Sequence, residues 1–182
     1  MSPLQGRRAL VTGSTERTGR AIAEHPAAQG AEGILHGRHD DERTQTAVAR
    51  FAKPPPILFA DVTSPQDCAE LAARCAALGG VDILVNNVGV YAPRDLAETD
   101  PTHWRWTLAG NLDATFYVCH AFPHQLLARL PRRILNPGFI RCAPLLASPF
   151  GPPHPLPHPP APFPPTSRPP HFAAPNEASL AQ

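Results

Sequence analysis

The chain has 182 residues, a length that suits one domain of ordinary size. Its 16 lysines and arginines almost balance its 15 aspartates and glutamates, so it lacks the basic field that recruits nucleic acid. The N-terminal residues contain no long apolar segment, so we expect no signal peptide and no membrane span, and we predict a cytoplasmic protein.

Proline is the most unusual feature of the composition. The whole chain has 25 prolines, and proline makes up roughly half of the segment Pro149–Pro175, whereas an average chain has about 5% proline. Such a segment lacks the backbone donors that helices and inner strands need, so a polyproline-II or disordered tail is expected. We therefore predict a folded domain over residues 1–148 and a Pro-rich tail over residues 149–182.

Apolar runs alternate with helical patterns along the first part of the chain. Ala9–Gly13 is predicted to be a buried strand and Thr18–Gln29 a helix, although Pro26 lies inside that helix. An interior proline costs a helix about 3 kcal/mol. Glu32–Gly37 is predicted as a second strand, and Asp41–Phe51 as a helix with acidic residues in its first turn.

The same alternation continues to residue 136. Strands are predicted over residues 56–62, 81–87 and 132–136. Ser64 and Pro65 are typical of a helix start, and a longer helix is predicted from Asp100 toward Leu130. This order predicts an α/β fold with a Rossmann-like, doubly wound parallel sheet, incomplete at its C-terminal side, whose ligands bind at the carboxyl ends of the strands.

The segment Val-Thr-Gly-Ser-Thr-Glu-Arg-Thr-Gly links the first strand to the first helix. Gly13 permits a sharp turn there, and Gly19 lets the helix pack close to the sheet. The helix would then present free N–H groups to a pyrophosphate. An ordinary strand-to-helix turn would contain the same two glycines, so this motif does not decide the function alone.

Three further motifs accompany this turn. TGSTERTG resembles the TGxxxGxG turn of the short-chain dehydrogenases/reductases, and Asn86–Gly89 (NNVG) resembles their NNAG motif. Asp61 resembles the aspartate that contacts adenine, and Asn111 resembles the asparagine of the catalytic tetrad. The resemblance covers about Gly6–Ser148. It implies a nicotinamide cofactor and hydride transfer to or from a small carbonyl or alcohol substrate.

The resemblance also implies a set of cofactor-binding residues. They are Gly13, Ser14, Arg17, Thr18, Gly19, His36, Arg38, Asp61, Val62, Asn87, Val88 and Gly89. No metal ligands are predicted, because the four cysteines form no CxxC pair and are expected to be reduced and mostly buried.

The end of the second strand favours NADP over NAD. Gly37 stands where NAD-dependent members usually carry an acidic residue, and Arg38 follows it. A guanidinium group suits the 2′-phosphate of NADP. The alternative is that Arg38 is a surface loop residue, and that His36 and His39 are solvated loop histidines rather than parts of a phosphate pocket.

Arg17 occupies the place of the middle glycine in the TGxxxGxG turn. A TGxxxRxG turn is similar to that of the pteridine reductases and their relatives, which use NADPH. Arg17 could reach a phosphate or an anionic edge of the substrate. A 3-oxoacyl carrier-protein reductase or a sugar or steroid dehydrogenase would share the other motifs.

The other catalytic residues of the family have no counterpart in this sequence. Gly138 and Phe139 stand where the paired serines are expected. No Tyr-x-x-x-Lys can be formed, because the only tyrosines are Tyr91 and Tyr117 and the only lysine is Lys53. Catalysis is therefore expected to be impaired. The family is usually homo-oligomeric, but the segments that form much of the interface and the substrate pocket are not found here.

Several alternatives remain open for the C-terminal part. A reading-frame shift near codon 148 would explain the abrupt change in composition. The segment Pro159–Pro165 could bind an aromatic groove, which would make the chain a non-catalytic nucleotide-binding or proline-tail interaction protein. His154 and His158 have the spacing of a helical metal pair, but the intervening prolines forbid the helix. The product could also be a remnant that folds poorly.

Overall fold

The computed structural model describes residues 2–128 and 133–137. All of them lie in Met1–Phe139, the first of the two units into which the chain divides. The predicted Pro-rich tail, with His154, His158 and Pro159–Pro165, is outside the described residues. Gly138 and Phe139 are outside them as well.

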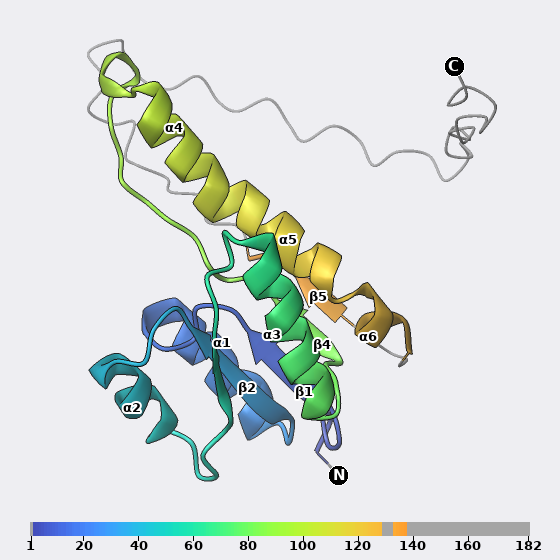
Figure 1. Ribbon diagram of the computed structural model, residues 1–182. Coiled ribbons are helices and arrows are strands. Elements are labelled where there is room, and N and C mark those ends of the chain that lie inside the picture. The colour runs from blue at the N-terminus through green and yellow to red at the C-terminus, as the bar shows by residue number, and fades with distance from the viewer. Residues whose placement is uncertain (1, 129–132, 138–182) are drawn as a thin grey trace, which may run out of the picture. The chain divides into compact units, whose positions relative to one another are not determined.

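The described strands form one parallel sheet (Figure 1). The strands are β1 (Arg8–Val11), β2 (Glu32–Gly37), β3 (Ile57–Phe59), β4 (Ile83–Val85) and β5 (Arg133–Leu135). Their order is β3-β2-β1-β4-β5, so the chain moves outward from β1 to β3 and then returns to the other side of β1. This confirms the predicted doubly wound sheet and places its switch point between β1 and β4.

Helices follow the strands in the predicted order. They are α1 (Arg17–Ala28), α2 (Glu42–Val48), α3 (Pro65–Ala77), the 3₁₀ turn η1 (Leu96–Glu98), α4 (Pro101–Leu108), the π-helical turn η2 (Ala109–Asp113), α5 (Ala114–Ala121) and α6 (Pro123–Ala128). Figure 1 shows that α4, η2 and α5 follow one another in a single long rod. The predicted long helix is therefore confirmed, and it contains a π-helical turn that the sequence pattern does not reveal.

The helix starts follow from polar side chains that accept free backbone N–H groups. The Ser64 hydroxyl accepts the Asp67 N–H at 3.2 Å, and Asp100 accepts the Thr102 and His103 N–H groups at 2.8 Å. Pro26 lies in the last turn of α1 rather than at its centre, so the helix runs on for only two residues and ends at Ala28.

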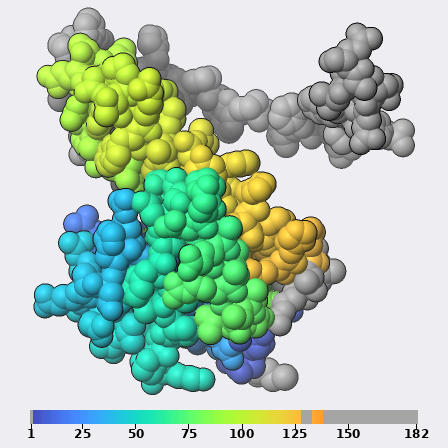
Figure 2. All heavy atoms as spheres, in the orientation of Figure 1, coloured from blue at the N-terminus to red at the C-terminus, as the bar shows by residue number. Residues whose placement is uncertain are grey.

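Each face of the sheet has its own apolar cluster. On one face, Leu10, Ile34 and Leu84 pack with Leu71 of α3 and with Phe122, which directly follows α5. Figure 2 shows α3 in direct contact with α5 on this side. On the other face, Val11, Leu35 and Val85 pack with Ala23 of α1 and Ala47 of α2. Neighbouring residues of β1 thus enter opposite layers, as the pleat of a strand requires.

Two cysteines of α3 belong to the core. Cys68 and Cys75 are fully buried and free of disulfides. Burial raises the pKa of Cys68 to about 11 and that of Cys75 to about 12, so both thiols stay protonated. The expected burial of the cysteines is confirmed for these two residues. Cys119 is partly buried.

Among the described residues, β5 is an edge strand of the sheet. All three residues of this strand are exposed, and Ile134 and Leu135 each retain 47% of their accessible surface. Parallel strands are normally covered on both faces. The sheet is therefore incomplete on the C-terminal side within the described residues. Over the same part of the chain, no helix is long and apolar enough to cross a membrane.

Candidate functional site

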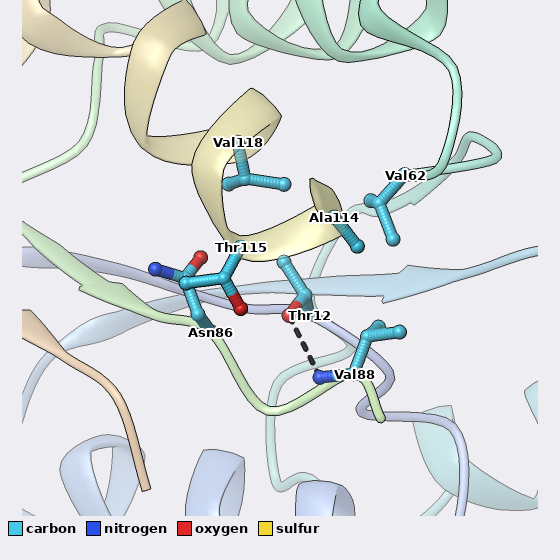
Figure 3. Close-up of a pocket in the computed structure, with 7 residues that line it drawn as sticks. All are labelled: Thr12, Val62, Asn86, Val88, Ala114, Thr115 and Val118. Carbon is cyan, nitrogen blue, oxygen red and sulfur yellow. Dashed lines mark hydrogen bonds between the residues drawn. The ribbon is translucent and has the colours of Figure 1, made fainter. Parts of the chain in front are cut away.

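The loops that follow β1 and β4 are tied together at the switch point. Thr12 Oγ1 accepts the backbone N–H of Asn87 at 2.9 Å. It also accepts the backbone N–H of Val88 at 3.1 Å, the bond drawn in Figure 3. In return, the Asn87 amide donates to the carbonyls of Thr12 at 3.0 Å and Gly13 at 3.2 Å. The TG and NNVG motifs, 74 residues apart, therefore form one rigid unit.

A small pocket lies between this unit and α5. Figure 3 shows Thr12 and Val88 at the strand ends, opposite residues from α5. The lining residues are Thr12, Val62, Asn86, Val88, Ala114, Thr115 and Val118. Thr12 and Asn86 were not among the predicted site residues, although both are polar residues that directly follow apolar strands.

Asn86 joins the ends of β4 and β5. Its side-chain nitrogen donates to Asn136 Oδ1 at 2.8 Å and to the Cys119 sulfur at 3.1 Å, and the residue is 6% exposed. Its Oδ1 is buried and has no hydrogen-bond donor among the described residues. This side chain thus supports the wall of the pocket next to the open edge of the sheet.

Gly13 and Gly19 bring the start of α1 against the end of β1. Gly13 has φ +62°, in the left-handed region that favours glycine. A Cβ atom at Gly19 would lie 1.9 Å from the Gly13 carbonyl oxygen and 2.5 Å from the Asn87 amide nitrogen. The free N–H groups at the start of α1 consequently lie beside the strand end, where an anion can approach them.

Arg17 is the only non-glycine residue with positive φ in the part of the chain that the structure describes, at +47°. Its side chain is 87% exposed, and its guanidinium lies 4.0 Å from Glu16. The left-handed conformation costs an ordinary residue about 1–2 kcal/mol. The backbone at this position therefore retains the shape that a glycine would prefer. Thr18, the next residue, is also exposed at the surface of the turn.

Replacing Arg17 with glycine is expected to raise the free energy of unfolding by about 1 kcal/mol, because glycine adopts the left-handed conformation without a steric penalty. Urea denaturation at neutral pH would measure the change. Arg17→Ala, which removes the charge but keeps the strain, is the control and should show no gain. If both variants were equally stable, backbone strain would not be the cause.

His36 lies at the end of β2, beneath the turn rather than on its surface. It is 2% exposed, and its Nδ1 accepts the Gly13 N–H at 3.1 Å. Burial lowers the pKa of His36 to about 4, against smaller opposing effects from the Ala60 carbonyl and the Asp61 carboxylate. The ring is therefore neutral at physiological pH.

Arg38 and Asp61 meet beyond the ends of β2 and β3. Their side chains form an ion pair, and the Arg38 side chain is still 66% exposed. Burial raises the pKa of Asp61, but hydrogen bonds from Thr63 and the Arg38 charge outweigh this effect, so the net pKa is lowered. The two predicted cofactor residues are thus adjacent, with a guanidinium that solvent can reach.

Asn111 connects the π-helical turn to the loop after β4. Its Oδ1 accepts the Val90 N–H at 3.0 Å, and its Nδ2 donates to the carbonyls of Val90 at 3.0 Å and Thr107 at 2.9 Å. A π-helical turn interrupts the regular ladder of helix hydrogen bonds. The Asn111 side chain donates to the Thr107 carbonyl at this interruption. Its two bonds to Val90 hold the loop next to Gly89 in place.

The profile of the short chain dehydrogenases matches residues 7–137. Galactitol 2-dehydrogenase (L-tagatose-forming) from Cereibacter sphaeroides is 35% identical over 135 residues, covering 74% of this chain and 53% of that protein. Gluconate 5-dehydrogenase from Gluconobacter oxydans is 32% identical over 137 residues, covering 73% of this chain and 53% of that protein.

Solved structures agree with these sequence relatives. The 3-oxoacyl (acyl-carrier-protein) reductase from Agrobacterium tumefaciens C58, solved with NADP bound, is similar with a TM-score of 0.67 and 32% identity. The match covers 73% of this chain and 52% of that one. The chain thus spans about half the length of the relatives it matches. The turn at Gly13–Gly19, the NNVG loop, the sheet order and these similarities together show that the chain belongs to the short-chain dehydrogenase family.

Proposed function

We propose that this chain binds NADP(H) at the carboxyl end of its sheet and does not by itself transfer hydride. The observation that carries the first part is the close contact of Gly19 with Gly13, where an added Cβ would lie 1.9 Å from a carbonyl oxygen. Such an approach leaves the first N–H groups of α1 open to a dinucleotide phosphate. The residues present at this end of the sheet therefore fit the cofactor.

Arg38 and Asp61 supply the adenosine end of the proposed site. The exposed Arg38 guanidinium would bind the 2′-phosphate that distinguishes NADP from NAD, and Asp61 would contact the adenine. Because the two side chains are paired, a 2′-phosphate must share Arg38 with the Asp61 carboxylate. Several related structures contain NADP or NADPH, which supports this choice of cofactor.

The second part of the proposal rests on residue types. A bound NADPH supplies a hydride, but the family's proton donor is a tyrosine assisted by a lysine four residues later. Here Tyr91 and Tyr117 are followed at that spacing by Asp95 and Ala121, and Lys53 lies between α2 and β3. The chain therefore keeps Asn111 of the tetrad without a partner for proton transfer. The substrate class inherited from the family is a small carbonyl or alcohol, and the expected compartment is the cytoplasm.

Titration of the purified 182-residue chain with NADPH is expected to show saturable binding. Nicotinamide fluorescence and the rise in melting temperature measure it. A panel of sugars, 3-oxoacyl thioesters and pterins should give no turnover. Turnover of any of them would overturn the claim that hydride transfer is lost. Failure to bind NADPH, with a broad melt, would overturn the cofactor assignment and favour a poorly folded remnant.

The variant Arg38→Gln tests the cofactor choice in the same assay. Loss of a charge-assisted contact to phosphate should weaken NADPH binding by about 10-fold to 100-fold and leave NADH binding unchanged. Arg105→Gln removes an exposed arginine from α4 and is the matched control. Equal losses of NADPH and NADH affinity in Arg38→Gln would contradict a 2′-phosphate contact.

A further inference from the structure

His36 is attached to the glycine-rich turn through both its backbone and its ring. The Ser14 N–H donates to the His36 carbonyl at 2.9 Å, and the His36 N–H donates to Ser14 Oγ at 2.9 Å. The third bond runs from the Gly13 N–H to His36 Nδ1 at 3.1 Å. Ser14 is fully buried and His36 nearly so, and the Gly13 bond is partly buried, so water competes only weakly for these bonds. We refer to this set of three bonds as the His36 clasp.

The clasp requires one tautomer of the ring. A backbone N–H can only donate, so Nδ1 must be unprotonated and the ring proton must lie on Nε2. Nε2 is buried and has no well-aligned hydrogen bond among the described residues, although the Ala60 carbonyl acts on the ring. The well-aligned hydrogen bond of this ring is therefore the one that Nδ1 accepts from Gly13.

The clasp also decides which N–H groups of the turn are free. The Gly13 N–H is directed inward to His36, and the Ser14 N–H is used by the His36 carbonyl. Neither can bind an anion without breaking the clasp. An incoming phosphate is left with the N–H groups that follow Ser14, among them those of the first turn of α1, which begins at Arg17.

We propose that His36 is a positioning residue, which holds Gly13 and Ser14 in place through the clasp and so presents the start of α1 to the phosphates of a dinucleotide. This inference rests on the proposed function, since it assumes that a dinucleotide binds there. His36 contacts no phosphate itself. Its role differs from the sequence-based expectation, in which it belonged to the phosphate pocket or to a solvated loop.

Two substitutions at His36 separate positioning from mere packing. His36→Asn keeps an acceptor oxygen near the place of Nδ1, whereas His36→Leu leaves the partly buried Gly13 N–H without one. His36→Leu should weaken NADP⁺ binding about 10-fold to 100-fold, as expected for an unpaired buried donor, and His36→Asn should stay within about 3-fold of the natural protein. His25→Asn, at an exposed histidine of α1, is the control.

Calorimetric titration with NADP⁺ gives the affinities, and nitrogen NMR of the natural protein gives the tautomer without any variant. We expect protonated Nε2, bare Nδ1 and a Gly13 amide that stays protected from exchange when NADP⁺ binds. Equal affinity of His36→Leu and the natural protein, or a proton on Nδ1, would overturn the inference. Absence of NADP⁺ binding by the natural protein would instead overturn the proposed function, and the NMR result would still test the clasp.

Discussion

Replacing Gly19 with alanine is expected to abolish detectable NADPH binding and to lower the free energy of unfolding by about 2 kcal/mol or more. The added methyl group would lie 1.9 Å from the Gly13 oxygen and 2.5 Å from the Asn87 amide nitrogen. Neither neighbour can move freely, because one is backbone and the other is bonded to the carbonyls of Thr12 and Gly13. The start of α1 must therefore move away from the sheet, and its N–H groups no longer lie where they could bind a phosphate.

The size of this effect contrasts with the usual result of the same change in a helix. Alanine favours a helix over glycine by about 1 kcal/mol, so an open position would be stabilised. Gly33→Ala in β2 is the matched control, since its Cβ would meet the nearest atom, in Pro55, at an ordinary 3.8 Å. Urea denaturation and NADPH titration of both variants provide the comparison. Unchanged NADPH affinity in Gly19→Ala would show that the cofactor does not use this turn.

The sheet and the helix starts are predictable from the sequence because each depends on a local pattern. Short apolar runs bounded by glycine or proline mark the strands, and β2 has the predicted bounds Glu32–Gly37. Ser64 before Pro65 defines the start of α3, which the structure confirms. The TG and NNVG motifs each follow an apolar strand, and they meet in the structure because the carboxyl ends of parallel strands share one edge of the sheet.

The finer features of the site depend on contacts between distant residues. The sequence cannot reveal the pairing of Arg38 with Asp61, because both residues are equally plausible as separate ligands. The π-helical turn at Asn111 is hidden for a similar reason, since the amide that supports it bonds to Val90, 21 residues away. Burial of His36 is not predictable because β2 is covered on both faces, so its residues show no polar and apolar alternation.

Acidification from pH 7 to pH 4 is expected to lower the free energy of unfolding by up to about 3 kcal/mol through His36. Burial lowers the pKa of this ring from 6.5 to about 4 in the folded chain. Below pH 6.5 the His36 ring therefore binds a proton in the unfolded chain but not in the folded chain. The free energy of unfolding then falls by up to about 1.4 kcal/mol per pH unit. The loss ends near pH 4, where the folded ring is protonated as well.

His36→Asn removes this titration and should flatten the stability profile between pH 6.5 and pH 4, as measured by urea denaturation at each pH. The ionisable group whose charge acts on the ring is Asp61 from the end of β3, and its own partner is Arg38, on the loop that follows His36. Because the pKa of Asp61 is lowered from 3.8, this carboxylate stays charged across the range from pH 6.5 to pH 4. Its contribution to the free energy of unfolding is lost only below that range. Equal slopes for the natural protein and His36→Asn would show that the ring is not held neutral. The supporting outcome has two parts: a loss of stability in acid in the natural protein but not in His36→Asn, and weaker NADP⁺ binding by His36→Leu. Together they would show that the same buried nitrogen, Nδ1 of His36, supports both the stability of the turn and its affinity for the cofactor.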